Sequence, residues 1–240
     1  MFACLAGSFF VVAPLRAADD TMALPEASKV SQLNFLKPGQ PDAALLLCPP
    51  PILGSAEQLA ELDEVRAVYH AASDEDKQAA YGEKKFTVYN FTGAVGPYFV
   101  AANLPKTTAF FAKVQLDAET VTDLGKDHFK RPRPFVTDPS LKNGVLEKSF
   151  SYPSGHSTES MVLALVLADM LPDQQDAIIA HARQMGWHRV QTARHYPSDI
   201  MAGRTLAQAI WQHLKESDEY QKEFAEAKAE LEAARNAAKN

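Results

Sequence analysis

The stretch Ser151–Ser157, SYPSGHS, stands shortly before an apolar run, VLALVLADML, at residues 162–171. The run predicts a buried helix, and Ser154 and Gly155 stand where that helix should begin. The first backbone N–H groups of a helix have no partner within it, so they attract anions, and a glycine lets an anion approach closely. His156 in the first turn is placed to protonate a leaving oxygen. An ordinary capped helix with an incidental histidine is the alternative interpretation.

A second segment, Lys126–Pro134 (KDHFKRPRP), gathers basic side chains in a chain whose net charge is -6. The planar guanidinium of Arg133 matches phosphate oxygens, and the ammonium of Lys126 supplies a point charge. The segment therefore indicates a local basic pocket for an anion. A solvated loop with routine ion pairs is the alternative, because charged side chains are usually exposed.

A third segment, Arg189–Asp199 (RVQTARHYPSD), ends in a helix that Pro197 would open. Asp199 follows His195 by four residues, close enough to accept a hydrogen bond from one ring nitrogen and leave the other nitrogen free to attack. Arg189 adds a further contact for an oxyanion. The alternative is a local histidine–aspartate ion pair at a helix start.

Together the three segments fit phosphoryl transfer, which needs cations on the phosphate oxygens, an in-line nucleophile and an acid for the leaving oxygen. Their order and spacing resemble the signature of the type 2 phosphatidic acid phosphatase (PAP2) superfamily, which also includes vanadium haloperoxidases. The motifs that carry this likeness are Lys126-x6-Arg133-Pro134, Pro153-Ser154-Gly155-His156 and Arg189-x5-His195-x3-Asp199. Further stretches resemble the bacterial class A non-specific acid phosphatases, namely LLLCPPP, NFTGAVG, KDHFKRPRPF, SYPSGHS and AKAELEAA.

The resemblance implies an all-α, single-domain helical bundle and a metal-independent phosphomonoesterase with no cofactor. It implies that His195 is the nucleophile and forms a phosphohistidine, with Asp199 orienting it. His156 would be the general acid and then the base that activates water. The phosphate would be held by the other motif residues, Lys126, Arg133, Ser154, Gly155 and Arg189. A phosphohistidine serves transfer to an alcohol as well as hydrolysis, so phosphotransferase activity is a further expectation.

The chain departs from the family pattern at Tyr196-Pro197, near the expected mouth of the pocket, and at position 188. The family usually has serine directly before the arginine of the third motif, where this chain has His188. A histidine at this place would either change the charge of the pocket or point away from it. Substrate preference is the property that such a change would alter, since the chemistry rests on the other residues.

Other functions share parts of this pattern. A vanadate-dependent haloperoxidase would hold vanadate at the same residues, although this chain is short for one. The spacing His195-x3-Asp199 also resembles the HxxxD motif of acyltransferases, which leaves the basic segments unexplained. A metal site on His156, His195 and Asp199 would lack the closely paired histidines that are usual in zinc enzymes. A non-catalytic phosphate-binding protein would need the arginines but not the histidine–aspartate pair.

The periodicity of apolar residues predicts a mostly α fold, and no strong strand pattern is present. In the last expected helix a narrow apolar stripe, beginning at Tyr220, fits a solvated tail helix best, with packing on the body or on a second subunit as alternatives. The expected helices cover 55–68, 75–82, 85–102, 106–125 with a stop near Gly125, 155–171, 172–187, 197–214 and 218–236.

The first residues predict a secretory signal peptide over 1–18, truncated at its start because no basic residue lies near Met1. Proline and glycine over 19–54 predict an extended arm, and 55–240 would form the helical phosphatase domain. The resemblance then implies export to the periplasm, small-molecule phosphomonoester substrates and a homodimer. The net charge of -6 argues against nucleic acid as a partner, and no stretch reaches transmembrane length, so we expect no stable membrane insertion.

Overall fold

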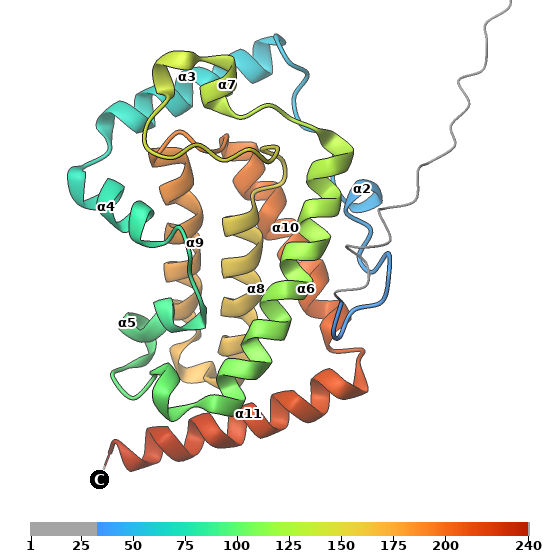
Figure 1. The fold of residues 1–240 in the computed structure, drawn as a ribbon, viewed down its shortest axis with the longest axis vertical. Helices are drawn as coiled ribbons and strands as arrows, with labels where there is room; N and C mark the ends of the chain where they lie inside the picture. The colour runs from blue at the N-terminus through green and yellow to red at the C-terminus, as the bar shows by residue number, and fades with distance from the viewer. Residues whose placement is uncertain (1–32, 240) are drawn as a thin grey trace, which may run out of the picture.

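The computed structural model describes residues 33–239, and this part of the chain consists of helices and loops without a strand (Figure 1). Helix α8 lies at the centre and packs against three others. The all-α bundle expected from the sequence is therefore confirmed. The helices of this central bundle are α6 (Pro105–Phe129), α8 (Gly155–Met170), α9 (Gln175–Gln191) and α10 (Pro197–Leu214).

The position of α8 follows from its composition. Its apolar residues are buried all round the helix, as expected of a helix that has no solvated face. Gly203 allows α10 to approach its first turn, since a Cβ there would lie 2.9 Å from the carbonyl oxygen of Ser154. The close contact fixes the start of α10 against the start of α8, and both starts carry residues of the candidate site.

The remaining elements cover the sides and ends of the bundle. In Figure 1, α3 and α7 lie at one end, α4 lies beside α9, and α11 crosses the opposite end. The helices are α2 (Ala43–Leu46), α3 (Ala56–Ala71), α4 (Asp74–Gly82), α5 (Thr92–Val95), α7 (Pro134–Thr137) and α11 (Asp218–Ala237). Short 3-10 helices cover Val88–Phe91, Ala101–Asn103, Pro139–Leu141 and Pro172–Gln174.

The prediction of a solvated tail helix is wrong, because α11 packs on the body of the protein. Tyr220, Ala227 and Leu231 of its apolar stripe are buried in the main core. The ring of Tyr220 lies 5.3 Å from the ring of Phe110 of α6 and 5.6 Å from the ring of Phe35. A cluster of aromatic rings thus covers the stripe, and the charged residues of the helix face outward.

Two other helix predictions need correction. Residues 85–102 form only the short elements named above, because Gly96 has a φ of 129° and Pro97 follows it. Helix α6 does not stop at Gly125 but continues to Phe129. Glycine is needed there for packing, since a Cβ would lie 3.1 Å from side-chain atoms of both Ala43 and Pro153.

The described part of the arm lies along α6 (Figure 1). The carboxylate of Asp117, fully buried on α6, accepts hydrogen bonds from the backbone N–H groups of Asn34, Phe35 and Leu36. A buried carboxylate needs such partners, so this cluster of donors anchors the arm. Helix α2, which follows in the arm, packs on the same helix.

Residues 1–32 and residue 240 lie outside the described residues. The signal peptide over 1–18, the first part of the arm and the boundary at residue 55 therefore stay predictions. Within residues 33–239, no helix combines the length and the apolar character that a membrane crossing requires.

Candidate active site

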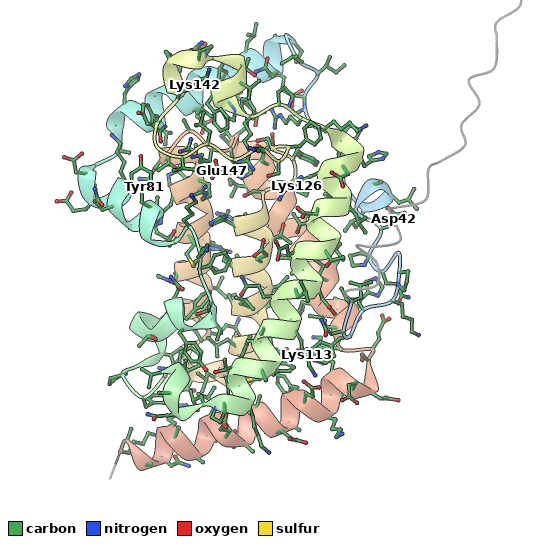
Figure 2. All side chains as sticks on the ribbon, viewed as in Figure 1. Asp42, Tyr81, Lys113, Lys126, Lys142 and Glu147 are labelled. Carbon is green, nitrogen blue, oxygen red and sulfur yellow. The ribbon has the colours of Figure 1, made fainter. Side chains whose placement is uncertain are left out.

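The antiparallel order of the bundle brings the three motifs to one end. Lys126 lies near the end of α6, His156 in the first turn of α8, Arg189 in the last turn of α9 and Asp199 in the first turn of α10. Figure 2 shows Lys126 and Glu147 at this end, far from α11. A pocket of about 340 Å³ opens here, and the motif residues that line it are Lys126, Arg133, Gly155, His156, Arg189 and His195.

The surroundings of His195 define which of its ring nitrogens can attack. Nε2 lies 3.1 Å from Nη1 of Arg133, and a guanidinium only donates, so Nε2 carries the lone pair. Nδ1 then carries the proton and lies 3.4 Å from Oδ2 of Asp199. The lone pair of His195 therefore faces the arginine that would hold an anion, and the aspartate fixes this tautomer.

Asp199 belongs to a network that the sequence did not reveal. Its Oδ2 accepts hydrogen bonds from the hydroxyl of Ser151 at 2.6 Å and from the backbone N–H of Tyr196 at 2.8 Å. Its Oδ1 accepts from Arg131 at 2.6 Å, and Arg131 also binds Glu61 at 2.6 Å. Burial alone would raise the pKa of Asp199, but the hydrogen bond with His195 and the charge of Arg131 outweigh it and lower the pKa. The carboxylate therefore stays ionised behind the histidine.

Burial also decides the charge states around the pocket. Burial, with the charge of Arg133, lowers the pKa of His195 to about 3, so its ring is neutral in mildly acidic water. Burial lowers the pKa of Arg133 to about 10, so its guanidinium stays charged. Arg189 also has its pKa lowered by burial. The neutral ring of His195 thus lies beside the buried cations Arg133 and Arg189. An anionic phosphate in the pocket would neutralise part of their charge.

Arg189 lines the pocket with unused hydrogen-bonding capacity. Its side chain is 4% exposed, and within residues 33–239 its Nε has no hydrogen-bond partner. Its Nη2 donates to Oε1 of Glu147 at 2.7 Å, and Oε2 of the same carboxylate lies 3.2 Å from Nε of Arg194. Burial would raise the pKa of Glu147, but the charges of Arg189 and Arg133 lower it. Glu147 is therefore an anion on the arginines that would bind phosphate.

Exchange of Glu147 for glutamine is expected to tighten the binding of inorganic phosphate, measured as a competitive inhibitor, by about three- to tenfold. A neutral amide competes less than a carboxylate for the guanidinium of Arg189. Glu119→Gln, which removes the same charge from an exposed side chain at the pocket, is the matched control. Weaker phosphate binding in Glu147→Gln would contradict the prediction and show that the carboxylate holds the arginines ready.

The ring of His156, which belongs to α8, is contacted by residues of the segment that follows α4. Its Nε2 lies 3.1 Å from the carbonyl oxygen of Glu83, and its ring lies 5.3 Å from the ring of Phe86. Because a carbonyl only accepts, Nε2 carries a proton and Nδ1 is left for a ligand. Burial, with the charge of Arg189, lowers the pKa of His156 well below its ordinary value. The protonated ring is therefore a stronger acid than an ordinary imidazolium.

The start of α8 divides its roles between two residues. Ser154 is fully buried and its hydroxyl accepts a hydrogen bond from the backbone N–H of Ser157, so it caps the helix. Gly155 lines the pocket, and a Cβ there would lie 3.2 Å from Nζ of Lys126 and 3.2 Å from Oε1 of Glu159. Glycine at this position therefore leaves room for the lysine beside the first turn of the helix.

The far side of the pocket is polar and was missed by sequence reasoning. Oε2 of Glu159 accepts a hydrogen bond from Gln115 at 3.2 Å, and Lys126 binds Asp123 at 2.9 Å. Burial, with the charge of Glu119, raises the pKa of Glu159 to about 7. Gln115, Glu119 and Glu159 therefore add polar groups to the pocket lining beside Lys126.

The structure thus places all eight predicted site residues at one end of the bundle, six of them on the pocket and two behind it. Sequence reasoning assigned no role to Arg131 or Ser151, although both lie inside the motif segments. It also missed Glu83 and Glu147, which carry no local signal because they are lone acidic residues in ordinary surroundings. A larger hollow of about 710 Å³ lies against α11 and is lined partly by Pro97 and several alanines, so it offers no comparable chemistry.

Comparison with known proteins identifies the class. The profile of the PAP2 superfamily matches residues 107–222. A non-specific acid phosphatase of Providencia stuartii is 30% identical over 87% of this chain and 90% of its own length. An acid phosphatase of Zymomonas mobilis is 31% identical over 82% of this chain and 78% of its own length. A solved bacterial vanadium-dependent iodoperoxidase shares the fold, with a TM-score of 0.54 and 20% identity over 73% of this chain and 53% of that one.

Fold and relatives together define an all-α phosphatase. The chain belongs to the PAP2 superfamily, and within that superfamily it is an acid phosphatase. The resemblance drawn from the motifs is therefore confirmed at the level of the family.

Proposed function

We propose that the protein hydrolyses small phosphomonoesters through a phosphohistidine on His195, without a metal ion. The observation that carries the proposal is the orientation of this ring. Its Nε2 lone pair lies 3.1 Å from Arg133 in the pocket, while Nδ1 faces the buried Asp199. A phosphate held by the arginine would have its phosphorus beside the attacking nitrogen.

The proposed reaction has two steps. Nε2 of His195 bonds to phosphorus as the P–O bond of the ester breaks, and protonated His156 gives its proton to the leaving oxygen. His156, now neutral, takes a proton from water as the water oxygen bonds to phosphorus and the P–N bond breaks. Phosphate leaves, and both histidines regain their first states. An alcohol in place of water would make the second step a phosphotransfer.

The side chains in the pocket can supply the charge that a metal would otherwise supply. Lys126, Arg133 and Arg189 together bring three positive charges to the pocket, and cations repel a metal ion. Within the described part of the chain, no three histidine, cysteine, aspartate or glutamate side chains gather as metal ligands. The positive charge of the pocket is what supports metal independence. Export to the periplasm and a homodimer stay predictions from the sequence.

The test is hydrolysis of an aryl phosphate by the purified protein from about pH 4 to pH 9, with and without excess EDTA. We expect full activity in the chelator. Loss of activity on chelation that added metal restores would refute metal independence. Absence of turnover at every pH would favour the phosphate-binding protein, and peroxidase activity that depends on added vanadate would favour the haloperoxidase.

In the same assay we expect the rate to be higher at about pH 5 than at about pH 8. The pKa of His156 is lowered by burial, so the protonated acid becomes more abundant as the pH falls. The pKa of His195 is about 3, so the nucleophile stays neutral over this range and the rate falls only in stronger acid. A rate that rises steadily to pH 9 would contradict the role of His156.

A further inference from the structure

His188, one of the positions that depart from the family pattern, lies outside the pocket lining and is buried. The residue is 5% exposed, and its Nδ1 lies 2.8 Å from Oε2 of Glu83. Glu83 is 7% exposed and ends α4, where its N–H donates to the carbonyl of Ala79 at 3.1 Å. The contact therefore ties the end of α4 to the last turn of α9, one residue before Arg189.

The backbone of the same glutamate reaches the proposed general acid. The carbonyl oxygen of Glu83 lies 3.1 Å from Nε2 of His156 and sets which ring nitrogen faces the pocket. Three residues later, the ring of Phe86 lies 5.3 Å from the ring of His156. Lys84, Lys85 and Phe86 line the pocket, so the segment that begins at Glu83 both orients the acid and forms a wall of the pocket.

We propose that His188 is a positioning residue, which acts through Glu83 to fix the carbonyl that orients His156. The inference rests on the proposed function, in which His156 is the general acid. Hydrogen bonds to a charged group are stronger than those between neutral groups, so the buried pair can hold residue 83 in one place. A serine hydroxyl at position 188 would end one bond short of the place of Nδ1. The contact with Glu83 therefore depends on the longer side chain of histidine.

The proposal predicts a dependence on the leaving group. A general acid matters most when the leaving oxygen is basic, because such a group needs a proton in the transition state. A misplaced His156 should therefore lower the rate of hydrolysis of esters with basic leaving groups and leave the rate for activated esters almost unchanged. Loss of a contact that merely joins α4 to α9 would slow all esters alike.

The experiment measures kcat/KM for substituted phenyl phosphates, from 4-nitrophenyl to 4-methoxyphenyl phosphate. For His188→Leu we expect a loss of about 10- to 100-fold with 4-methoxyphenyl phosphate and less than about threefold with 4-nitrophenyl phosphate. The inhibition constant of inorganic phosphate should change less than about threefold, because the arginines are untouched. His188→Asn should restore the original dependence, since its amide N–H replaces Nδ1–H.

Activity on 4-nitrophenyl phosphate also reports whether a variant folds. His188→Leu leaves the Glu83 carboxylate buried without its partner, which is costly. If that variant does not fold, the double variant Glu83→Met/His188→Leu carries the test, because replacing both members of a buried pair by apolar residues is often tolerated. The double variant should show the same selective loss.

His156→Ala is the reference that separates the positioning role of His188 from the proposed role of His156 as general acid. If its leaving-group dependence is no steeper than that of the unchanged protein, His156 is not the general acid and the proposed function fails. If it is steeper while the His188 variants keep the original dependence, the positioning role is overturned. A loss that is uniform across the esters would overturn it as well.

Discussion

Replacement of His195 by alanine is expected to lower kcat by at least about 10⁴-fold, while the protein still binds inorganic phosphate. Without the imidazole there is no atom to form the P–N bond. Phosphate binding should persist because Arg133, Arg189 and Lys126 remain. The measurements are steady-state turnover of an aryl phosphate and calorimetric titration with inorganic phosphate.

The exposed His128, which lies on α6 within the basic segment Lys126–Pro134, offers a matched control. His128→Ala should keep turnover within about threefold of the unchanged protein, since surface substitutions have small effects. Brief reaction with labelled substrate followed by a basic quench should trap phosphoprotein in the unchanged enzyme and in His128→Ala, but not in His195→Ala. Near-normal turnover in His195→Ala would refute the assignment of His195 as the nucleophile.

Replacement of Asp199 by asparagine is expected to lower kcat by about 10⁴-fold, although the side chain keeps its shape. The carboxylate accepts from Arg131 on one oxygen and from Ser151 and Tyr196 on the other. An amide has only one oxygen, so its NH₂ must face a donor in either orientation. If the NH₂ faces Nδ1 of His195, the ring changes tautomer and Nε2 loses its lone pair.

The same substitution should lower the free energy of unfolding by about 3 kcal/mol, because it breaks a buried pair with Arg131. Kinetics and denaturant unfolding of the variant measure the two effects separately. Asp138→Asn is the control, since Asp138 pairs with Arg66 outside the pocket at 2.7 Å and should leave kcat unchanged. A fall in stability without a fall in kcat would reduce Asp199 to a structural role.

Much of the fold and of the site was predictable because the decisive signals are local. Ser154 caps α8, and Pro197 opens α10, as their positions in the sequence indicate. A helix start depends on a few neighbouring residues, so it can be recognised without knowing the rest of the chain. The apolar composition of α8 likewise predicted a buried helix, and its neighbours then had to pack around it.

Where the local signal was ambiguous, the sequence prediction failed. The stripe on α11 is too narrow to say what covers it, and contact with distant parts of the chain, such as the rings of Phe35 and Phe110, decides that it is buried. Gly125 predicts the end of a helix, but α6 continues past it, and the glycine allows close packing against Ala43 and Pro153. In both cases a partner far along the chain outweighs the local preference.

The sequence by itself determined the helical class, the three motifs and the chemistry they indicate, because each rests on residues close together in the chain. Only the tertiary structure decided which acidic side chains serve those motifs. Glu83 and His188 are 105 residues apart in the sequence, and Glu147 and Arg189 are 42 residues apart. An isolated carboxylate has no pattern of its own, and its role depends on which charges the packing of the helices brings within hydrogen-bonding distance.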